Sequence, residues 1–564
     1  MDKKRLSLEL LLLSSVFVIA TCGLIYELVA GALASYLLGD SVKQFSFIIG
    51  VYLFSMGVGS YLAKFIKGSL IDKFIEIEIL VGIVGGISSV VLFLLFNTVG
   101  HFEWALYFFV FSTGCLVGLE IPLLMNILKD KVQFKDLVSN VFAFDYVGAL
   151  LASILFPLVL IPNLGIIKTP LFFGLINISI AIFLCFYLKN DLLKPFSLKI
   201  KSIGAFVLLF VLFIFSDRIL SFSEEKLYGE NVVYANNSPY QRIVLTRNNK
   251  EFRLYLNNNL QFSSTDEYRY HEALVHPAMS MAKNIDHVLI LGGGDGFAVR
   301  EVLKYKNVKN VTLVDLDGEM TSFFKNNETM RQLNRSSLSD KKVNVINKDA
   351  YIWVKENKQK FGVIIIDFPD PSNYSLGKLY SLQFYHELEK ITTTDTKIVV
   401  QTTSPYFAPK SFWCIEKTTN EVFPFTKAYH TYVPSFGEWG FSMASFEPVN
   451  NKIYRKIPNL KFYDYNFSQM SFFSKDMKAN SVEINRLDNQ ILVRYFDEEL
   501  GESTVEKIFL KQLFWAVSCF LFCSIVARKA NLFYLKYQEL ITFSVTDFGL
   551  KTSLNLRKQF VQNI

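Results

Sequence analysis

Hydrophobic residues follow two different patterns along this chain. Up to about residue 220 they form long runs that are separated by short segments containing lysine. Residues 45–63 and 79–100, for example, contain no charged residue. Runs of this length match the roughly 20 apolar residues that a helix needs to cross a bilayer. From about residue 221 the apolar runs become short and alternate with polar and glycine-rich segments. We therefore predict a multi-pass α-helical membrane domain followed by a soluble region.

Six segments of the first region are predicted to cross a membrane. They are residues 8–30, 45–63, 79–100, 104–128, 141–162 and 170–188. A seventh apolar run, residues 202–216, has only 15 residues between Lys201 and Asp217 and is short for a crossing. The pattern therefore leaves open whether six or seven helices cross.

Lysine residues are concentrated in alternate loops of this region. Lysines lie near the N-terminus and in the loops after the second, fourth and sixth predicted crossings. The lysines of the other loops are Lys43 and Lys168 alone. Because cytoplasmic loops are enriched in Lys and Arg, the N-terminus is expected in the cytoplasm. The soluble region then lies in the cytoplasm only if the number of crossings is even.

Three acidic residues, Glu27, Glu120 and Asp145, fall inside the predicted crossings. Ionisable groups at this depth are energetically costly and usually face the interior of a helix bundle. Two interpretations stay open: a structural hydrogen-bond network, or a site for a cation such as an organic polycation.

The composition excludes several classes of protein. With 51% hydrophobic and 19% charged residues and a net charge of +7, the 564-residue chain is not an intrinsically disordered protein. Six cysteines are too few for a disulfide-rich scaffold, and neither they nor the histidines have metal-site spacing. There is no nucleic-acid-binding signature.

Strands and helices are predicted to alternate in the soluble region. Residues 240–262 alternate apolar and polar positions around Asn-rich turns, which indicates antiparallel β-hairpins. A helix near 267–282 follows, and then buried strands near 287–292, 311–317, 343–350, 361–371 and 397–405. This order favours a doubly wound α/β fold, which binds its ligands at the carboxyl ends of the strands.

These patterns divide the chain into four parts. We expect a transmembrane domain at 1–220, an N-terminal β-hairpin part at 221–265, a Rossmann-like domain at 266–502, and a C-terminal extension at 503–564 with one hydrophobic segment at 508–526.

A glycine-rich loop follows the first strand of the α/β region. Gly292, Gly294 and Gly296 would let the backbone approach a nucleoside closely, and Asp315 ends the next strand, where an acid binds ribose hydroxyls. No basic residue accompanies the loop, so a pyrophosphate ligand is not expected.

Carboxylates gather at the predicted strand ends. Asp367 and Asp370 belong to the sequence Asp-Phe-Pro-Asp-Pro, whose prolines fix an irregular turn, and Asp295 lies in the glycine loop. Such a pair of carboxylates can bind an ammonium group and accept a proton from an amine before it attacks. The pocket is therefore expected to bind a cation.

Residues 238–446 resemble the spermidine synthases, or polyamine aminopropyltransferases. The resemblance rests, in chain order, on Tyr240-Gln241, Asp266-Glu267, Tyr270-His271-Glu272, the Gly-Gly-Gly-Asp-Gly loop at 292–296, Asp315, Asp349-Ala350, Asp367 with Asp370-Pro371, Leu379-Tyr380, Gln401, Ser404-Pro405, Val433-Pro434 and Trp439-Gly440-Phe441. The membrane region resembles the membrane-integral branch of that family at residues 23–27, 118–122 and 145–148. Thr403 and Tyr374 depart from the family pattern, and Asp315 stands where the family more often has Glu.

The resemblance implies an α/β domain of the S-adenosylmethionine methyltransferase type and a reaction without a metal or cofactor. The donor would be decarboxylated S-adenosylmethionine, the acceptor putrescine or a similar diamine, and the products spermidine and methylthioadenosine. The residues implied to hold the nucleoside are Gln241, Gly292, Gly294, Asp315, Asp349 and Ala350, and those implied to hold the amine are Tyr270, His271, Asp295, Asp367 and Asp370. Asp367 would take the proton from the attacking amine, and Asp370 would help to place it.

Two other functions stay open. A methyltransferase on the same fold would use ordinary S-adenosylmethionine, but Asp295 would repel its carboxylate. A polyamine transporter or sensor would keep a non-catalytic synthase-like domain beside the intramembrane acids. The expected location is the cell membrane, with lipid as a partner and the synthase domain in the cytoplasm, where the donor is made. Homo-oligomer formation is left open.

Overall fold

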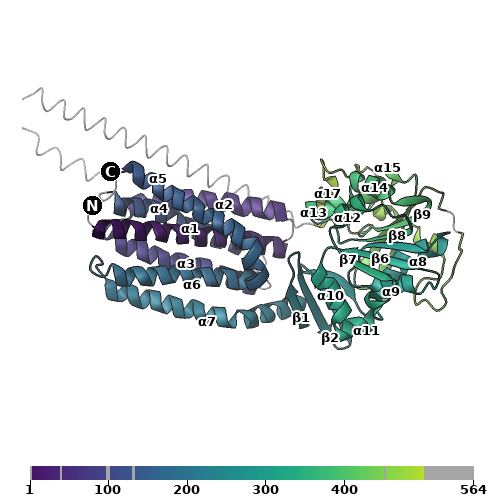
Figure 1. Ribbon diagram of the computed structural model, residues 1–564, viewed down its shortest axis with the longest axis horizontal. Coiled ribbons are helices and arrows are strands. Elements are labelled where there is room, and N and C mark those ends of the chain that lie inside the picture. Colours follow the sequence, from purple (N-terminus) through teal and green to yellow (C-terminus); the bar gives the residue numbers. More distant parts are fainter. Residues whose placement is uncertain are drawn as a thin grey trace, which may run out of the picture. The chain divides into compact units, whose positions relative to one another are not determined.

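The computed structural model describes residues 3–38, 41–96, 102–129, 134–449, 452–479 and 481–500 (Figure 1). The predicted extension 503–564, including the hydrophobic segment 508–526, lies outside the described residues.

The first region consists of long helices. Their bounds are α1 Lys3–Leu38, α2 Ser41–Leu62, α3 Leu70–Phe96, α4 Phe102–Leu128, α5 Phe134–Leu155, α6 Ile161–Tyr187 and α7 Pro195–Tyr228. Among the described residues, six helical stretches are long and apolar enough to cross a membrane. One of them, Lys135–Tyr187, combines α5 and α6. A π-helical turn at Phe156–Leu160 lies between the two helices, and the non-helical backbone of Gly165 interrupts α6 near its start.

The short apolar run 202–216 is the middle of α7. This helix has 34 residues and continues past the expected boundary at 220 to Tyr228. Because a helix rises about 1.5 Å per residue, α7 is long enough to cross a bilayer. The sequence pattern underestimated it because Lys199, Lys201 and Asp217 limit the charge-free run but do not interrupt the helix.

Helices α1 and α3 run in the same direction. The ring of Tyr26 packs on Gly85, and further along both helices the ring centroid of Tyr36 lies 5.9 Å from that of Phe93. The residue numbers rise together on both helices, which is the signature of a parallel pair.

Helix α7 runs parallel to α3 as well. Near the start of both helices Lys201 Nζ lies 2.9 Å from Glu76 Oε1, and near their ends Ser223 donates a 2.8 Å hydrogen bond to the carbonyl of Phe93. Therefore α1, α3 and α7 share one direction, and the chain leaves α7 at the end of the bundle opposite to the start of α1.

The predicted hairpins form a four-stranded antiparallel sheet. Its strands are β1 Asn231–Asn237, β2 Arg242–Asn248, β3 Glu251–Leu256 and β4 Asn259–Ser263, in that order. Phe262 of β4 packs against the rings of Phe297 and Phe324, and its sheet belongs to the same core cluster as the larger sheet. The hairpin part therefore has no separate core of its own.

A seven-stranded sheet with helices on both faces follows. Its strand order is β10-β11-β9-β8-β5-β6-β7. Strands β5 to β9 are parallel, and β11 is antiparallel to both of its neighbours, β9 and β10. The strands are β5 His287–Gly292, β6 Asn310–Asp315, β7 Val343–Asn347, β8 Phe361–Asp367, β9 Thr392–Gln401, β10 Phe425–Val433 and β11 Gly437–Ser445. The helices are α8 Glu267–Met281, α9 Phe297–Leu303, α10 Gly318–Asn326, α11 Glu328–Leu333, α12 Ala350–Glu356, α13 Tyr374–Gly377, α14 Leu382–Glu389, α15 Pro409–Val422, α16 Phe467–Met470 and α17 Ile491–Leu500.

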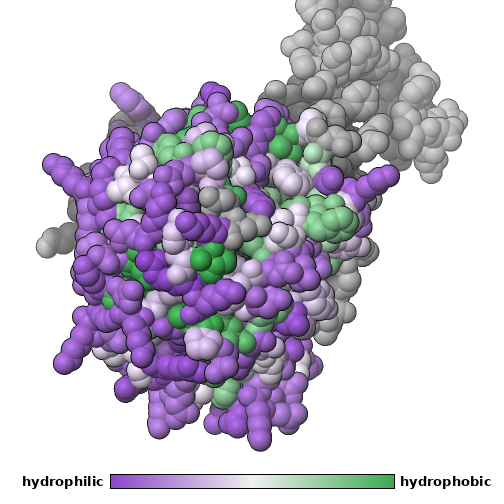
Figure 2. Space-filling view, turned by 90° about the vertical axis from the view of Figure 1, so that its right-hand side faces the viewer, coloured by the Kyte–Doolittle hydropathy of each residue, from purple (hydrophilic) through white to green (hydrophobic). Residues whose placement is uncertain are grey.

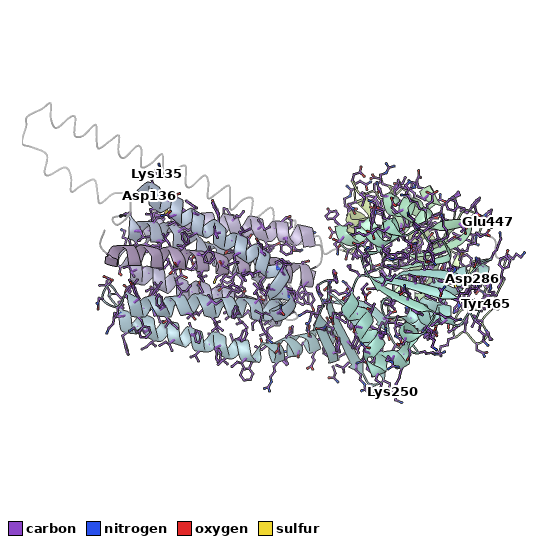
Figure 3. All side chains as sticks on the ribbon, viewed as in Figure 1. Lys135, Asp136, Lys250, Asp286, Glu447 and Tyr465 are labelled. Atoms are coloured by element: carbon purple, nitrogen blue, oxygen red, sulfur yellow. The ribbon has the colours of Figure 1, made fainter. Side chains whose placement is uncertain are left out.

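The two ends of this sheet differ in character. Strand order reverses between β5 and β8, and ligands bind outside the carboxyl ends of the strands at such a switch point. At the opposite ends, Asp286 precedes β5 and Glu447 follows β11, and both are labelled at that side of the sheet in Figure 3. These residues form ion pairs with Lys309 and Lys283, respectively. The outer face of this part is largely hydrophilic (Figure 2).

Candidate active site

The glycine loop brings the ends of β5, β6 and β8 into close contact. Gly292 is paired with Asp367 across the sheet and has φ of 80°, and a Cβ atom there would lie 2.2 Å from the carbonyl oxygen of Asp367. A Cβ atom at Gly294 would lie 2.8 Å from Oδ2 of Asp315. A side chain at either position would displace the neighbouring strand end or its carboxylate, so glycine is required at both positions for packing. At Gly292 the positive φ requires it as well.

Asp315 is hydrogen-bonded to backbone on both sides. Its carboxylate accepts hydrogen bonds from the N–H groups of Gly294 (3.0 Å) and Asp317 (2.8 Å), and burial raises its pKa to about 6. An acid in this position can accept hydrogen bonds from the hydroxyls of a ribose.

Gln241 reaches the same edge through a residue that the sequence analysis did not single out. Its side-chain amide donates a 2.8 Å hydrogen bond to Asp317, which also accepts one from Ser238 (2.7 Å). The sequence did contain a sign of this residue: Asp317 is the second acid of Val314-Asp-Leu-Asp317, directly after the end of the strand.

Asp349 lies at the end of β7 and begins α12. It accepts a hydrogen bond from the N–H of Tyr351 (2.8 Å) and pairs with Lys378 (2.7 Å). Burial raises the pKa of Asp349, but Lys378 and the backbone donors outweigh this effect and lower it overall. The adjacent Ala350 is buried in the core.

Tyr270 and Asp367 connect α8 to the end of β8. The tyrosine hydroxyl donates a 2.5 Å hydrogen bond to Oδ1 of Asp367. Burial raises the pKa of Asp367, whereas His271 and the hydrogen bond from Tyr270 oppose that rise. This carboxylate is thus more basic than usual, while its ionised form is still supported.

His271 is anchored by the first turn of its own helix. Its Nδ1 lies 2.8 Å from both the carbonyl oxygen and the carboxylate of Glu267, so Nδ1 carries the proton. Burial lowers the pKa of His271, but Glu267, Asp295 and Asp367 together raise it to about 9. Glu267 is in turn bound by both terminal nitrogens of Arg300.

Three carboxylates converge where β5 and β8 end. Burial raises the pKa of Asp295 to about 6, with Asp367 contributing in the same direction, and burial also raises the pKa of Asp370 to about 6. Because like charges destabilise one another in a buried site, the arrangement favours a cationic ligand. The structure thus places these three acids at the strand ends, as expected from the sequence, and their role in binding a cation stays a prediction.

The turn that carries Asp370 is held from β9. Gln401 donates a 2.7 Å hydrogen bond to the carbonyl of Phe368 and lies 3.4 Å from Asp370, and Tyr380 donates to the carbonyl of Pro369 (3.0 Å). Both residues were part of the family resemblance, but their role in fixing this turn was not predicted. The following Thr403, a departure from the family pattern, is buried with φ of 67°.

Aromatic rings line the side of the site near Tyr270. Its ring centroid lies 6.4 Å from that of Trp439 and 6.5 Å from that of Phe436. Asp266 fixes this loop by accepting hydrogen bonds from the backbone and hydroxyl of Ser435 (2.7 and 2.9 Å). Aromatic faces beside carboxylates are suited to an ammonium group. Within the described residues, no group of three or more His, Cys, Asp or Glu residues could hold a metal ion.

The acids of the helical region lie apart from this site. Tyr52 interacts electrostatically with Glu27, Glu120 and Asp145, so the structure brings all three close to one tyrosine. A fourth acid, Glu78, interacts with Glu120. The sequence prediction missed it because the charge-free run began at residue 79, whereas α3 begins at Leu70.

Comparisons with known proteins show which family the chain belongs to. The family model described as "Spermine/spermidine synthase domain" matches residues 267–456. A polyamine aminopropyltransferase of Leptospira interrogans is 50% identical over 86% of this chain and 97% of its own length. Polyamine aminopropyltransferase 2 of Ralstonia nicotianae is 48% identical over 87% of this chain and 98% of its own length. The crystal structure of spermidine synthase from Thermotoga maritima is 27% identical, with a TM-score of 0.40, over 43% of this chain and 85% of that one. The identity to the first two relatives extends over nearly their whole length, and the chain therefore belongs to the polyamine aminopropyltransferase family.

Proposed function

We propose that the chain transfers the aminopropyl group of decarboxylated S-adenosylmethionine to putrescine or a related diamine, giving spermidine and methylthioadenosine. The observation that carries the proposal is the hydrogen-bonded pair of Tyr270 and Asp367, which lies beside the acidic residues Asp295 and Asp370 and next to the nucleoside edge at Asp315.

The nucleoside part of the donor would lie along the ends of β5, β6 and β7. Asp315 would accept hydrogen bonds from the ribose, Gly292 and Gly294 would allow close backbone approach, and Asp349 with Ala350 would flank the base. Gln241 would act from the hairpin sheet through Asp317. Proximity and orientation of this kind supply much of the rate of group transfer.

The amine would enter the pocket as a cation. A free alkylamine has a pKa of about 10, so it is protonated at neutral pH and must lose a proton before it attacks. Asp367 would take this proton, while Asp295 and Asp370 place the chain. His271, whose pKa of about 9 makes it a cation at neutral pH, would balance the charge of Asp295 and Asp367 and would not bind the ammonium group as the resemblance implied. The new bond forms between the amine nitrogen and the aminopropyl carbon, the bond from that carbon to the sulfonium sulfur breaks with its electron pair, and neutral methylthioadenosine leaves.

Asp295 argues against the methyltransferase alternative. It lies in the buried glycine loop, and above its pKa of about 6 it is ionised. The carboxylate of ordinary S-adenosylmethionine would meet this like charge, whereas the decarboxylated donor presents only an ammonium group.

The test is a donor comparison with the purified full-length protein. Putrescine is supplied with either the decarboxylated or the ordinary donor, and methylthioadenosine and methylated amine are measured. We expect methylthioadenosine from the decarboxylated donor only. Formation of methylated amine would support the methyltransferase, and no product from either donor would support a sensor or transporter.

We further propose that α1 to α7 span a membrane. Large apolar side chains are exposed along α2 to α7, where lipid would cover them; they include Leu53, Phe108, Leu150, Leu158, Phe183, Ile200 and Val207. We expect the chain to work as the four parts predicted from the sequence: membrane, hairpin, synthase and C-terminal. The one changed boundary is that of the membrane part, which α7 extends to Tyr228.

The helix directions bear on the side of the membrane that carries the synthase part. Since α1, α3 and α7 are parallel, residues after Tyr228 would emerge on the face opposite to the N-terminus. This argues against the even number of crossings on which a cytoplasmic synthase part depends. Combined with the lysine distribution, it supports a synthase part on the non-cytoplasmic face.

Labelling of single cysteines with a membrane-impermeant thiol reagent in intact cells tests this orientation. A cysteine at the exposed Lys250 of the β2–β3 turn (Figure 3) should be labelled without lysis, and one at Lys135 should require it. The inverse result would place the synthase part in the cytoplasm and the N-terminus outside.

A further inference from the structure

A buried ion pair attaches the end of helix α7 to the hairpin sheet. Arg242 of β2 donates from Nε to Oε1 of Glu224 (2.5 Å) and from Nη2 to Oε2 of the same carboxylate (2.8 Å). The side chains of Glu224 and Arg242 are 1% and 12% exposed, respectively. Pairing through two hydrogen bonds fixes a guanidinium and a carboxylate in orientation as well as in distance. The reaction proposed above uses neither residue.

Glu224 is fixed to the helix bundle by its surroundings. The preceding Ser223 donates a 2.8 Å hydrogen bond to the carbonyl of Phe93 in α3, and the ring of Phe93 lies 5.9 Å from that of Tyr36 in α1. Tyr36 interacts electrostatically with both Glu224 and Arg242. Helices α1, α3 and α7 therefore meet at this ion pair.

Arg242 also holds the neighbouring strands of the hairpin sheet. Its Nη1 donates a 3.0 Å hydrogen bond to Oδ1 of Asn237 at the end of β1, and its backbone N–H donates one of 3.0 Å to Oδ1 of Asn257 in the β3–β4 turn. A Cβ atom at Gly165 of α6 would lie 3.2 Å from Nδ2 of Asn237, so α6 approaches the same end of β1. One arginine thus joins the bundle to three parts of the sheet.

The turn between β1 and β2 carries Gln241, directly before Arg242. Inside this turn the N–H of Ser238 donates to the carbonyl of Gln241 (2.9 Å), and the N–H of Gln241 donates to the hydroxyl of Ser238 (3.0 Å). Both side chains donate to Oδ2 of Asp317 (2.7 and 2.8 Å), whose N–H donates to Asp315 (2.8 Å). One short turn therefore connects the ion pair to the candidate nucleoside edge.

The ion pair restricts the conformation of this turn. Fixing a loop in its binding conformation before the ligand arrives lowers the conformational entropy that is lost on binding. Because Arg242 follows Gln241 directly, the position of its guanidinium limits where the backbone of the turn can lie. Because Glu224 belongs to α7, this limit is set by the helix bundle.

We propose that Glu224 and Arg242 are positioning residues for the donor, which hold the turn at 238–241 in the arrangement that binds the nucleoside. The helix bundle then contributes to donor affinity through α7 without touching the donor. This proposal rests on the proposed function, because it takes the nucleoside to bind beside Asp315 and Gln241.

Steady-state kinetics of the full-length Arg242→Met protein test this role. We expect the donor KM to rise by roughly 10-fold, while kcat and the KM of the amine stay within about twofold of the wild type. In a Gln241→Ala background, Arg242→Met should change the donor KM by less than about twofold, because the residue through which the arginine acts is already missing. Glu224→Gln keeps the size of the side chain and should also raise the donor KM.

Arg253→Met is the matched control. Arg253 of β3 pairs with Glu230 (2.7 Å), just beyond the end of α7, but its strand does not carry the turn at 238–241. This variant should keep the wild-type donor KM. The proposal is overturned if Arg242→Met and Glu224→Gln, each with a wild-type melting temperature, also keep it. It is equally overturned if Arg242→Met has its full effect in the Gln241→Ala background.

Calorimetric titration with methylthioadenosine separates this proposal from the proposed reaction. Binding of the nucleoside needs no turnover, and Arg242→Met should weaken it by roughly 10-fold as well. A wild type that binds methylthioadenosine but forms no product would refute the reaction alone. Wild-type affinity in Arg242→Met would refute the positioning role alone.

Discussion

The hydroxyl of Tyr270 donates a 2.5 Å hydrogen bond to Oδ1 of Asp367, although the two residues are 97 positions apart in the chain. The bond joins α8 to the end of β8 at the centre of the acidic pocket. Burial makes this carboxylate more basic, and the tyrosine together with His271 partly offsets that effect. A base held in this balance can be ionised before the amine arrives and still accept its proton.

Replacement of Asp367 by asparagine should remove the proton acceptor. We expect the rate of methylthioadenosine formation to fall by roughly 10²- to 10⁴-fold, the usual contribution of a general base. Asp286→Asn is the control, because Asp286 is half-buried at the opposite end of the sheet, where it forms an ion pair with Lys309. Undiminished product from Asp367→Asn would rule out its catalytic role.

Tyr270→Phe should change the pH dependence more than the fold. Because the tyrosine hydrogen bond lowers the pKa of Asp367, its removal raises that pKa, and the base is then protonated up to a higher pH. The acidic limb of the kcat/KM profile should move upward by about one to two pH units, since a hydrogen bond to a charged group contributes about 1.5–3 kcal/mol. If the acidic limb of the Tyr270→Phe profile lies at the same pH as in the wild type, Asp367 is not the group that titrates there.

Asp295 should control the choice of donor. Replacement by asparagine removes a like charge that faces the carboxylate of ordinary S-adenosylmethionine, so binding of that compound should tighten by about tenfold. In the wild type, discrimination should weaken as the pH falls through about 6, where Asp295 becomes protonated. Calorimetric titration at pH 5.5 and 7.5 measures the ratio of the affinities for the two donors. An equal ratio at the two pH values would contradict the assignment of Asp295.

Asp315→Asn should weaken donor binding. An asparagine amide cannot replace a carboxylate that already accepts from two backbone N–H groups, and it loses the charge that holds the ribose. The KM of the donor should rise by roughly 10- to 100-fold, while kcat and the KM of the amine change little. Glu319→Gln is the control, because Glu319 is a neighbouring but exposed acid. It should leave kcat and the KM values of donor and amine near those of the wild type.

Gly292→Ala should be disruptive and Gly318→Ala tolerated. At Gly292 a Cβ atom would lie 2.2 Å from a backbone oxygen and φ is 80°, whereas at Gly318 the nearest atom would be 3.7 Å away. We expect Gly292→Ala to lower the free energy of unfolding by at least about 1–2 kcal/mol and to abolish turnover, because the β5–β8 contact must open. Thermal melts and product assays of both variants check this, and an active Gly292→Ala protein would show that the close approach is dispensable.

The sequence was sufficient for the kind and order of most elements and for the position of the acids along the sheet. The two apolar patterns, the glycine loop and the acids after each strand are local features, and a parallel sheet necessarily brings the carboxyl ends of its strands to one edge. For this reason Asp295, Asp315, Asp349, Asp367 and Asp370 could all be assigned to that edge without a structure.

Only the tertiary structure determined which groups touch. The bonds from Tyr270 to Asp367, from Gln241 to Asp317 and from Gln401 to the turn before Asp370 join elements far apart in the chain, and no spacing rule predicts them. In the bundle, the length of α7 and the inclusion of Glu78 depended on helix bounds that charge-free runs do not mark. The physical reason is the same in both regions: hydrophobic periodicity reports local burial, whereas register, helix direction and hydrogen-bond partners are set by how the elements pack against one another.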